Sequence, residues 1–320
     1  MNELQVLQQN SQNNSVLQEV LLLGFQGPRS SRFLLFTMFT GIYTLILSGN
    51  ILIIFTTISN QLLHSPMYFF LCNLSLSEML LTTNIIPKML QVLIRNRATM
   101  SLFGCLTQFF FFGIFILTDT FLLTAMSYDR YLAICRPLHY SNTMHFWLIC
   151  YLSAACWIIP YLVMSASMGI FLKLHYCGKR NQIDHFFCDR GPIVRLACSD
   201  TAAADTAFEF ISASCSLFPF IFIILTYVFI VRDIIKIQSV TGKRKAFSTC
   251  SSHLSVVSTH YLTLFIVYLV PISSHSLLIN KFLSLLYTVV TPLLNPFIYS
   301  LSNREIKEAI GLPLKFRKKV

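Results

Sequence analysis

The sequence predicts an all-α, polytopic membrane protein: a bundle of seven transmembrane helices followed by a short amphipathic eighth helix. Of its 320 residues, 55% are hydrophobic and only 12% are charged, about half the charge of an ordinary soluble domain. The apolar residues gather in seven runs, and each is long enough to cross a bilayer, which takes about 20 residues as a helix. These runs are roughly 33–58, 66–90, 102–135, 144–168, 204–235, 245–271 and 282–300. They show no period-2 alternation, which excludes the strands of a membrane barrel.

The chain divides into three predicted parts. Residues 1–32 are polar and form an N-terminal segment, which we expect to be extracellular. Within this segment "VLLLGF" is too short for the apolar core of a signal peptide, so we expect the first membrane helix to direct insertion. Residues 33–300 form the seven-helix domain. Residues 301–320 continue as an amphipathic helix, expected along the inner membrane surface, and a basic cytoplasmic tail.

Charge and sequence motifs predict an extracellular N-terminus in the plasma membrane. Lysine and arginine are in weak excess on the side that would then be cytoplasmic. Asn13 begins an "NNS" glycosylation sequon, and the tail "KFRKK" suits the anionic lipids of the inner leaflet. The net charge of +11 therefore indicates contacts with membrane lipid. No basic stripe lies on a soluble surface, so a nucleic-acid partner is not predicted.

Four of the ten cysteines lie on the predicted outer side, namely Cys105, Cys177, Cys188 and Cys198. An oxidising compartment favours two disulfides among them, with three possible pairings. The other six lie in spans or at inner ends, where cysteine is usually a small packing residue. Two histidines flank the outer cysteines, but their spacing does not match a zinc site, so no metal centre is predicted.

Two carboxylates fall deep inside predicted spans. Asp119 precedes Arg130 by 11 residues, which is about 16 Å of helix rise. Glu78 follows Pro66, at the inner end of its own span, by 12 residues or about 18 Å. The two spans run in opposite directions, so both carboxylates should reach nearly the same level of the membrane.

Two like charges at one level of low dielectric do not both stay ionised without help. One interpretation is a shared cation or proton site, since buried membrane charges are usually functional. The other is a pair of neutral acids that hydrogen bond to polar neighbours such as Asn50 and Asn295. Either interpretation predicts one polar layer in the bundle.

Helix geometry separates the charges of "ILTDTFLLTAMSYDRYLAIC" into two groups. Eleven residues turn a helix by about 1100°, so Asp119 and Arg130 lie on one stripe. Asp129 is turned away by about 100° and can pair with its neighbour or with another helix end. In the last span, Pro296 of "NPFIY" removes a helix hydrogen bond, which predicts a hinge.

Together these motifs resemble those of the rhodopsin-like G-protein-coupled receptors and, within that class, the olfactory receptors of the tetrapod type, class II. They occur in the order of that family from the first span to the last. The motifs are "GN" (49–50), "LHSPMYFFLCNLSLSE" (63–78), "MSYDRYLAIC" (126–135), "RPLHY" (136–140), "HFFCD" (185–189), "KAFSTCSSHLSVV" (245–257) and "PLLNPFIYSLSNREI" (292–306).

The resemblance implies an odorant receptor that raises cAMP through a stimulatory, olfactory-type G protein. Arg130 would form the inner ionic latch with Asp129 and Tyr131, and Tyr227 and Tyr299 would swing towards it on activation. The basic stretch 243–245 at the inner end of the sixth span would move outward.

The resemblance also implies two disulfides and an ion site. Cys105 would pair with Cys188, and Cys177 with Cys198. Glu78 and Asp119 match the acidic pair of the family, a sodium-type site, although the second-span acid is here the longer Glu. No other cofactor is implied. The sequence departs from the family at "HYL" (260–262), where many members have Phe-Tyr-Gly, so His260 and the bulk of Leu262 have no assigned role.

The predicted ligand pocket lies in the outer half of the bundle and is mostly apolar, which suits a small volatile molecule. Amine receptors have an aspartate where Phe112 stands, and opsins have a lysine where Val289 stands, so aminergic ligands and retinal are not expected. Ordinary packing between helices would use the same residue types. The candidates are Phe112, Gly113, Ile116, Leu117, Ile211, Cys215, Tyr261, Leu264, Tyr268 and Thr288. Gly113, which leaves room, and Tyr268, which offers a polar tip, are the favoured ones.

Two other classes of membrane protein share some of these features: transporters and intramembrane enzymes. A transporter would also place carboxylates in the membrane, but paired repeats with broken helices are absent from the sequence. An intramembrane enzyme needs a nucleophile with a base. Ser252–His253 and Ser258–His260 offer both groups, but neighbouring helix residues point to different faces. An enzyme is therefore not predicted.

Overall fold

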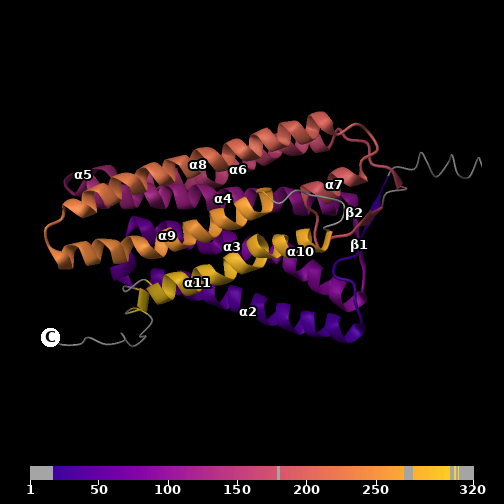
Figure 1. Ribbon diagram of the computed structural model, residues 1–320, viewed down its shortest axis with the longest axis horizontal. Helices are drawn as coiled ribbons and strands as arrows, with labels where there is room; N and C mark the ends of the chain where they lie inside the picture. The colour runs from indigo at the N-terminus through magenta and orange to yellow at the C-terminus, as the bar shows by residue number, and fades with distance from the viewer. Residues whose placement is uncertain (1–16, 179–180, 270–276, 303–305, 308, 310–320) are drawn as a thin grey trace, which may run out of the picture. The chain divides into compact units, whose positions relative to one another are not determined.

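The computed structural model describes residues 17–178, 181–269, 277–302, 306–307 and 309. The short elements are β1 (Glu19–Leu22), β2 (Ala98–Ser101), β3 (Gln182–Ile183) and α7 (Arg190–Leu196). The main helices are α2 (Arg29–Ser59), α3 (Pro66–Arg95), α4 (Leu102–Cys135), α6 (Phe146–Phe171), α8 (Ala202–Lys236), α9 (Val240–Leu269), α10 (Leu277–Leu285) and α11 (Thr291–Ser302). Three short helical segments connect or interrupt them: η1 (Gln61–Leu63), α5 (Pro137–Thr143) and η3 (Leu286–Val290). Figure 1 labels most of these elements.

Seven long helical stretches occupy the seven apolar runs of the described chain, the last being α10, η3 and α11 together. Six of them are long and apolar enough to cross a membrane. The remaining one, α9, carries histidines and a series of Ser and Thr residues along its length. The fold is therefore the predicted seven-helix membrane fold. The eighth helix and the basic tail fall mostly outside the described residues, as does Asn13.

Proline sets or interrupts several helices. Pro66 and Pro137 stand at the first positions of α3 and α5, where the missing N–H costs nothing. Pro296 lies within α11, as the predicted hinge requires. Just before α11, η3 is a π-helical turn, and the Thr291 N–H bonds to the Leu286 carbonyl five residues back. Such turns often mark functional sites, and the sequence analysis did not predict this one.

The chain divides into two compact units. Unit 1 comprises residues 1–41, 83–114 and 160–214, and unit 2 comprises 42–82, 115–159 and 215–320. Unit 1 holds the three strands, α7 and one half of several long helices. Unit 2 holds α5, the other halves, and all of α9 to α11, where α11 packs along α9.

A small sheet organises unit 1. β1 lies in the middle, antiparallel to β2 and parallel to β3, with Leu22 opposite both Ala98 and Ile183. Val20 and Leu22 are fully buried, so the apolar side chains of β1 hold this strand against its neighbours in the sheet. Figure 1 shows β1 and β2 side by side near α7.

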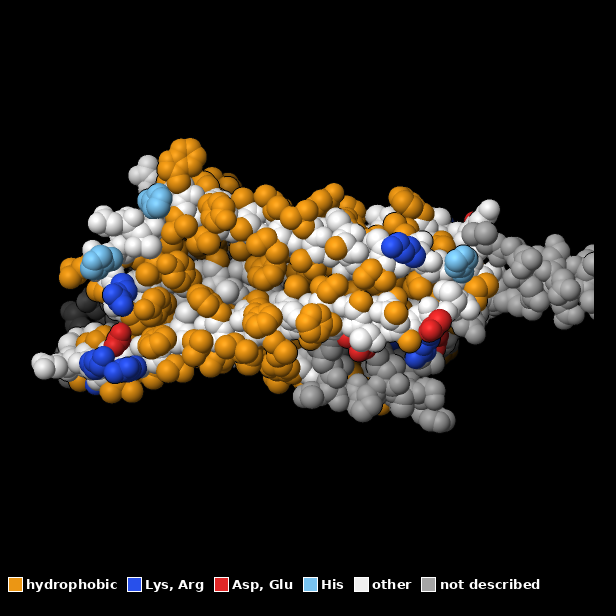
Figure 2. Space-filling model, turned by 90° about the horizontal axis from the view of Figure 1, so that it is seen from above, with side chains coloured by type: hydrophobic (Ala, Val, Ile, Leu, Met, Phe, Trp, Pro, Cys, Tyr) orange, Lys and Arg blue, Asp and Glu red, His pale blue; other side chains and the backbone are white. Residues whose placement is uncertain are grey.

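The surface is unlike that of a soluble protein. Large apolar side chains point outward along the helices, among them Phe210 and Phe218 of α8 and Trp147 and Tyr151 of α6. On the face shown in Figure 2, hydrophobic side chains cover most of the described surface and charged ones are few. A surface of this kind is stable in contact with lipid, where apolar exposure carries no cost.

Candidate functional site

The predicted polar layer forms inside unit 2. Glu78 of α3 and Asp119 of α4 are both buried, and their carboxyl groups interact electrostatically. The Asn295 amide nitrogen of α11 donates to the Glu78 Oε1, and the Asn50 side chain of α2 also hydrogen bonds to Glu78. Ser77 hydrogen bonds to Asp119. Four helices therefore meet at these carboxylates, and the two carboxyl groups lie close to each other, as their equal depth in the membrane predicts.

Three oxygen atoms of this layer remain unused. Asn50 Oδ1, Asp119 Oδ1 and Asn295 Oδ1 are buried and have no hydrogen-bond partner within the described part of the chain. Unsatisfied buried oxygens are rare in proteins, and a group of them calls for a ligand or water. Carboxylate and amide oxygens are the donors that hard cations prefer. These oxygens therefore fit a small monovalent cation, whereas the described chain has no group of three or more His, Cys, Asp or Glu residues placed to hold a metal ion.

A second charged group lies at the other end of the α4 segment in unit 2. The Arg130 Nε donates to Asp129 Oδ2 at 2.9 Å, and Arg130 Nη2 also bonds to that oxygen. Asp129 is fully buried and Arg130 is 9% exposed. A buried charge needs a partner, so this pair is a closed latch between neighbouring residues. Tyr131 does not join it, and its ring lies 6.0 Å from the ring of Phe229 on α8.

Tyr140 completes the latch, which the sequence analysis did not predict. Its hydroxyl donates to Asp129 Oδ1 at 2.8 Å, so Asp129 bonds to Arg130 through one oxygen and to Tyr140 through the other. Burial is the larger cause that raises the pKa of Tyr140, and the nearby Asp129 carboxylate raises it further. The phenol therefore stays protonated and can donate. Tyr140 closes the motif "RPLHY", but its partner could not be inferred from spacing because α5 is a separate helix.

His253 of α9 connects two other helices of unit 2. Its Nε2 lies 3.1 Å from the Leu123 carbonyl, which can only accept, so Nε2 carries the proton. The Nδ1 therefore accepts from the Tyr227 hydroxyl at 2.6 Å. Both ring nitrogens are occupied, so His253 cannot serve as a base for Ser252. Tyr299 is fully buried, and its hydroxyl has no partner among the described residues.

His260, the departure from the family pattern, bonds to Thr120 of α4. The Thr120 hydroxyl donates to the Ile116 carbonyl at 2.9 Å, so it must accept from His260 Nε2 at 3.0 Å. His260 therefore also occurs with Nε2 protonated, and it links α9 to the residue next to Asp119. Leu262 is 60% exposed and points away from this contact.

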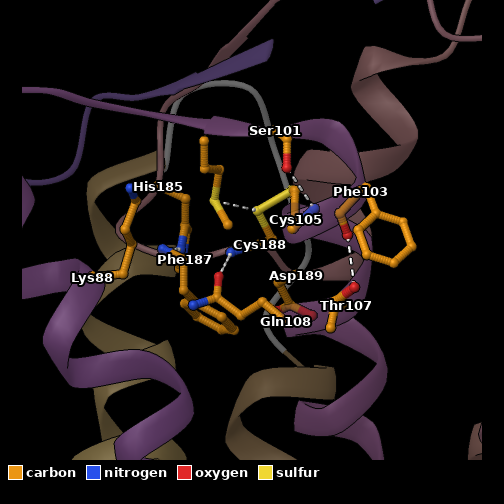
Figure 3. Close-up of a disulfide and its surroundings, with 12 residues drawn as sticks. Lys88, Ser101, Phe103, Cys105, Thr107, Gln108, His185, Phe187, Cys188 and Asp189 are labelled. Carbon is orange, nitrogen blue, oxygen red and sulfur yellow. Dashed lines mark hydrogen bonds between the residues drawn. A yellow bond between two sulfur atoms is a disulfide. The ribbon is translucent and has the colours of Figure 1, made fainter. Parts of the chain in front are cut away.

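The outer cysteines pair as the resemblance implied. Disulfides join Cys105 to Cys188 and Cys177 to Cys198. Gln108, one turn beyond Cys105, accepts from the Cys188 backbone N–H at 2.9 Å and donates to the Asn84 carbonyl at 2.8 Å. Figure 3 shows the first of these bonds beside the disulfide. The three-residue spacing from Cys105 was the sequence signal that could have identified Gln108.

The candidate pocket residues fall into both units, so each group is described on its own. In unit 1, the ring of Phe112 lies 5.3 Å from that of Phe187, and Ile211 is half-buried. The expected space beside Gly113 is absent, because Met164 of α6 fills it: a β-carbon on residue 113 would lie 2.4 Å from the Met164 Cε. Gly113 is therefore a packing position.

In unit 2, Tyr261 is the most informative candidate. It is buried, and its hydroxyl has no partner among the described residues, while its ring lies 4.7 Å from Phe220. The Thr288 hydroxyl instead donates to the Ser284 carbonyl at 2.7 Å. The Tyr268 side chain lies outside what the structure describes. The half-buried candidates of this unit are Ile116, Leu117, Cys215 and Leu264.

Comparison with solved structures identifies the fold. The crystal structure of squid rhodopsin superimposes with a TM-score of 0.66 over 90% of this chain and 86% of that one. The sequence identity is 17%, so this likeness shows the fold alone. The fold is that of the rhodopsin-like seven-helix receptors.

Comparison of sequences gives the family. A family model described as "Olfactory receptor" matches residues 39–315. Human olfactory receptor 11A1 is 44% identical over 300 residues, covering 94% of this chain and 95% of that receptor. Mouse olfactory receptor 5G29 is 41% identical over 308 residues, covering 96% of each. The chain belongs to the olfactory receptor family: it is a multi-pass membrane receptor for odorants that signals through a G protein, and it is not an enzyme.

Proposed function

We propose that this receptor binds a small, mostly apolar volatile molecule and raises cAMP through a stimulatory, olfactory-type G protein. The latch of Asp129, Arg130 and Tyr140 is the observation that carries the proposal. It is a buried charged cluster whose release would expose an arginine to an intracellular partner. The receptor would lie in the plasma membrane with its N-terminus outside, in contact with lipid.

The binding half of the proposal rests on Tyr261. Its buried, unpaired hydroxyl stands among aromatic side chains, including Phe220 and Phe265. A buried donor without a partner is costly, and a ligand oxygen would satisfy it. Apolar walls with one or two polar groups are typical of sites for small neutral molecules. Ile116 and Leu264, which lie in the same unit as Tyr261, would provide the apolar contacts.

The test uses the full receptor in cells that carry a cAMP reporter, screened with a chemically diverse odorant panel. We expect at least one odorant to raise cAMP, and Arg130→Ala to abolish the response at unchanged surface expression. Arg136→Ala is the matched control, because Arg136 is exposed and lies outside the latch. A normal response in Arg130→Ala, or a response seen only in a calcium reporter, would contradict the proposed coupling.

We further propose that the polar layer of Glu78 and Asp119 holds a sodium ion. The unused oxygens of Asn50, Asp119 and Asn295 support this assignment. An ion there would also relieve the repulsion between two carboxylates. Bound sodium should stabilise the purified receptor, since a ligand of the folded state raises its stability by mass action.

The sodium proposal is tested by thermal unfolding of the purified receptor in sodium and in choline chloride at equal ionic strength. Sodium should raise the midpoint for the native protein but not for Asp119→Asn. Asp205→Asn, a change of the same kind far from the layer along the chain, should keep the sodium effect. An effect that persists in Asp119→Asn, or that choline reproduces, would count against an ion at this site.

A further inference from the structure

A crevice outside the sites described above lies in unit 1, and nothing assigns it a ligand. Its volume is about 540 Å³, within the range of roughly 300–1,000 Å³ that is typical of small-ligand sites. The last turns of α3, Met100 of β2 and the first turns of α4 line it. We call it the β2 crevice. None of its residues is among the odorant-pocket candidates.

Lys88 is the charged residue of the β2 crevice. Its ammonium group donates to Gln91 Oε1 and to the Thr99 carbonyl, both at 2.8 Å. An ammonium group has three N–H donors, so one remains for a further acceptor. Both acceptors are neutral, and Lys88 forms no ion pair with any acid in the described part of the chain. The crevice therefore presents a half-buried positive charge without a counter-ion.

Apart from Gln91, which accepts from Lys88, the polar side chains that line the β2 crevice bond to other parts of unit 1. Gln108 uses its amide to bind Cys188 and Asn84, and the Asn84 amide donates back to the Gln108 carbonyl at 2.9 Å. The Thr107 hydroxyl donates to the Phe103 carbonyl (Figure 3). These bonds leave Lys88 as the group that is able to recognise the charged end of a ligand.

The rest of the wall is apolar. Pro87, Met100 and Phe103 line the crevice, and Phe103 is 78% exposed. An exposed aromatic ring beside an unpaired cation suits a molecule with an anionic head and a hydrocarbon tail. The volume accommodates a short alkyl chain, and burial of its CH₂ groups against this wall would favour binding.

We propose that the β2 crevice is a second ligand site, which binds a medium-chain carboxylate. The carboxylate accepts the free hydrogen bond of Lys88, and the alkyl chain lies against Pro87, Met100 and Phe103. A charge-assisted hydrogen bond of this kind is about twice as strong as a neutral one. The site should therefore distinguish octanoate from octan-1-ol, which has the same chain without the charge.

The test measures binding directly and does not depend on receptor signalling. The full receptor is purified in phosphatidylcholine nanodiscs and labelled with an octanoate analogue that carries a diazirine near the end of its chain. Labelled peptides are mapped by mass spectrometry. We expect labelling within 84–108, displaced by octanoate and at least about tenfold less well by octan-1-ol, the scale of one charge-assisted hydrogen bond.

Variants identify the residue responsible. Lys88→Gln should weaken labelling about tenfold, whereas Lys88→Arg should retain it. Arg97→Gln is the matched control, because Arg97 is exposed, follows the same helix and does not line the crevice. Thr107→Trp should block the crevice and abolish labelling without removing a charge. Intact disulfides and an unchanged unfolding midpoint show that each variant is folded.

Several results would overturn the proposal. One is competition by octan-1-ol as strong as that by octanoate, and another is labelling that survives both Lys88→Gln and Thr107→Trp. A third is labelling that maps outside 84–108. Finally, loss of labelling in nanodiscs that contain phosphatidylglycerol would show that Lys88 pairs with a lipid phosphate instead of a free carboxylate.

Discussion

Asp129 binds two partners at once, Arg130 and Tyr140, and these two bonds hold the latch closed. Arg130 is its neighbour in the chain, so the sequence is sufficient to suggest that bond. Tyr140 comes from α5, beyond a break in the helix at Arg136. Each bond stabilises the closed latch, and the loss of either should shift the receptor towards its active state.

Tyr140→Phe removes the weaker attachment and keeps the ring. We expect ligand-independent cAMP to rise about two- to tenfold, the effect of losing one hydrogen bond worth about 0.5–1.5 kcal/mol. The measurement is basal cAMP divided by surface expression. Tyr151→Phe is the control, since Tyr151 is exposed on α6. Equal basal activity in the two variants would show that Tyr140 does not hold the latch.

Residues of the polar layer were predictable because depth in a membrane helix follows from counting residues. Glu78 and Asp119 could be placed at one level without knowing any contact. The partners of His253 and Gln108 could not, because each bond joins segments far apart in the chain, such as Leu123 to His253. The protonated nitrogen of His253 also depends on which acceptors surround it.

At the scale of helices, α4 and α6 approach closely in unit 1 at Gly113. Gly113 admits the buried Met164 side chain to a distance that no β-carbon would allow. From the sequence alone, this glycine is expected to leave space for a ligand. A sequence shows that glycine has no side chain. Which group fills the space beside Gly113 depends on the helix that packs there, which is α6 with Met164.

Gly113→Ala should destabilise the receptor by about 1–3 kcal/mol, since extra volume in a packed interior forces side chains to move. The check is the free energy of unfolding or, failing reversibility, the midpoint. Gly169→Ala is the control, because a β-carbon there meets nothing within 4 Å. In a double-mutant cycle with Met164→Ala, the two costs should not add, whereas additive costs would mean that Met164 does not fill this space.

The last span shows how an element can differ from its expected form. Pro296 predicts a hinge, and Pro296 does lie inside α11. The π-helical turn at Leu286–Val290 precedes it by a few residues and has no proline. π turns are rare and mostly occur as single turns within α-helices, and no residue pattern in this stretch of the sequence indicated one.

At the scale of the whole molecule, the inverted surface follows from composition. Exposed residues such as Phe218, Trp147 and Tyr151 would promote aggregation in water and are stable in lipid. The two compact units share long helices, and α4 carries one cysteine of a disulfide, Cys105, in unit 1 and the arginine of the latch in unit 2. Charged groups with structural or signalling partners thus lie towards the helix ends or in one polar layer.

The sequence by itself determined the seven helices, the polar layer, the family and the arginine of the latch, because apolar run length, helix rise and local motifs are properties of the chain alone. The tertiary structure decided the partners: Tyr140 for Asp129, Tyr227 for His253 and Met164 for Gly113. It also decided that Lys88 of the β2 crevice bonds to neutral acceptors, with no acidic partner among the described residues. Hydrogen bonds and packing between distant segments depend on which surfaces meet in three dimensions, and no periodicity or spacing in the sequence encodes that directly.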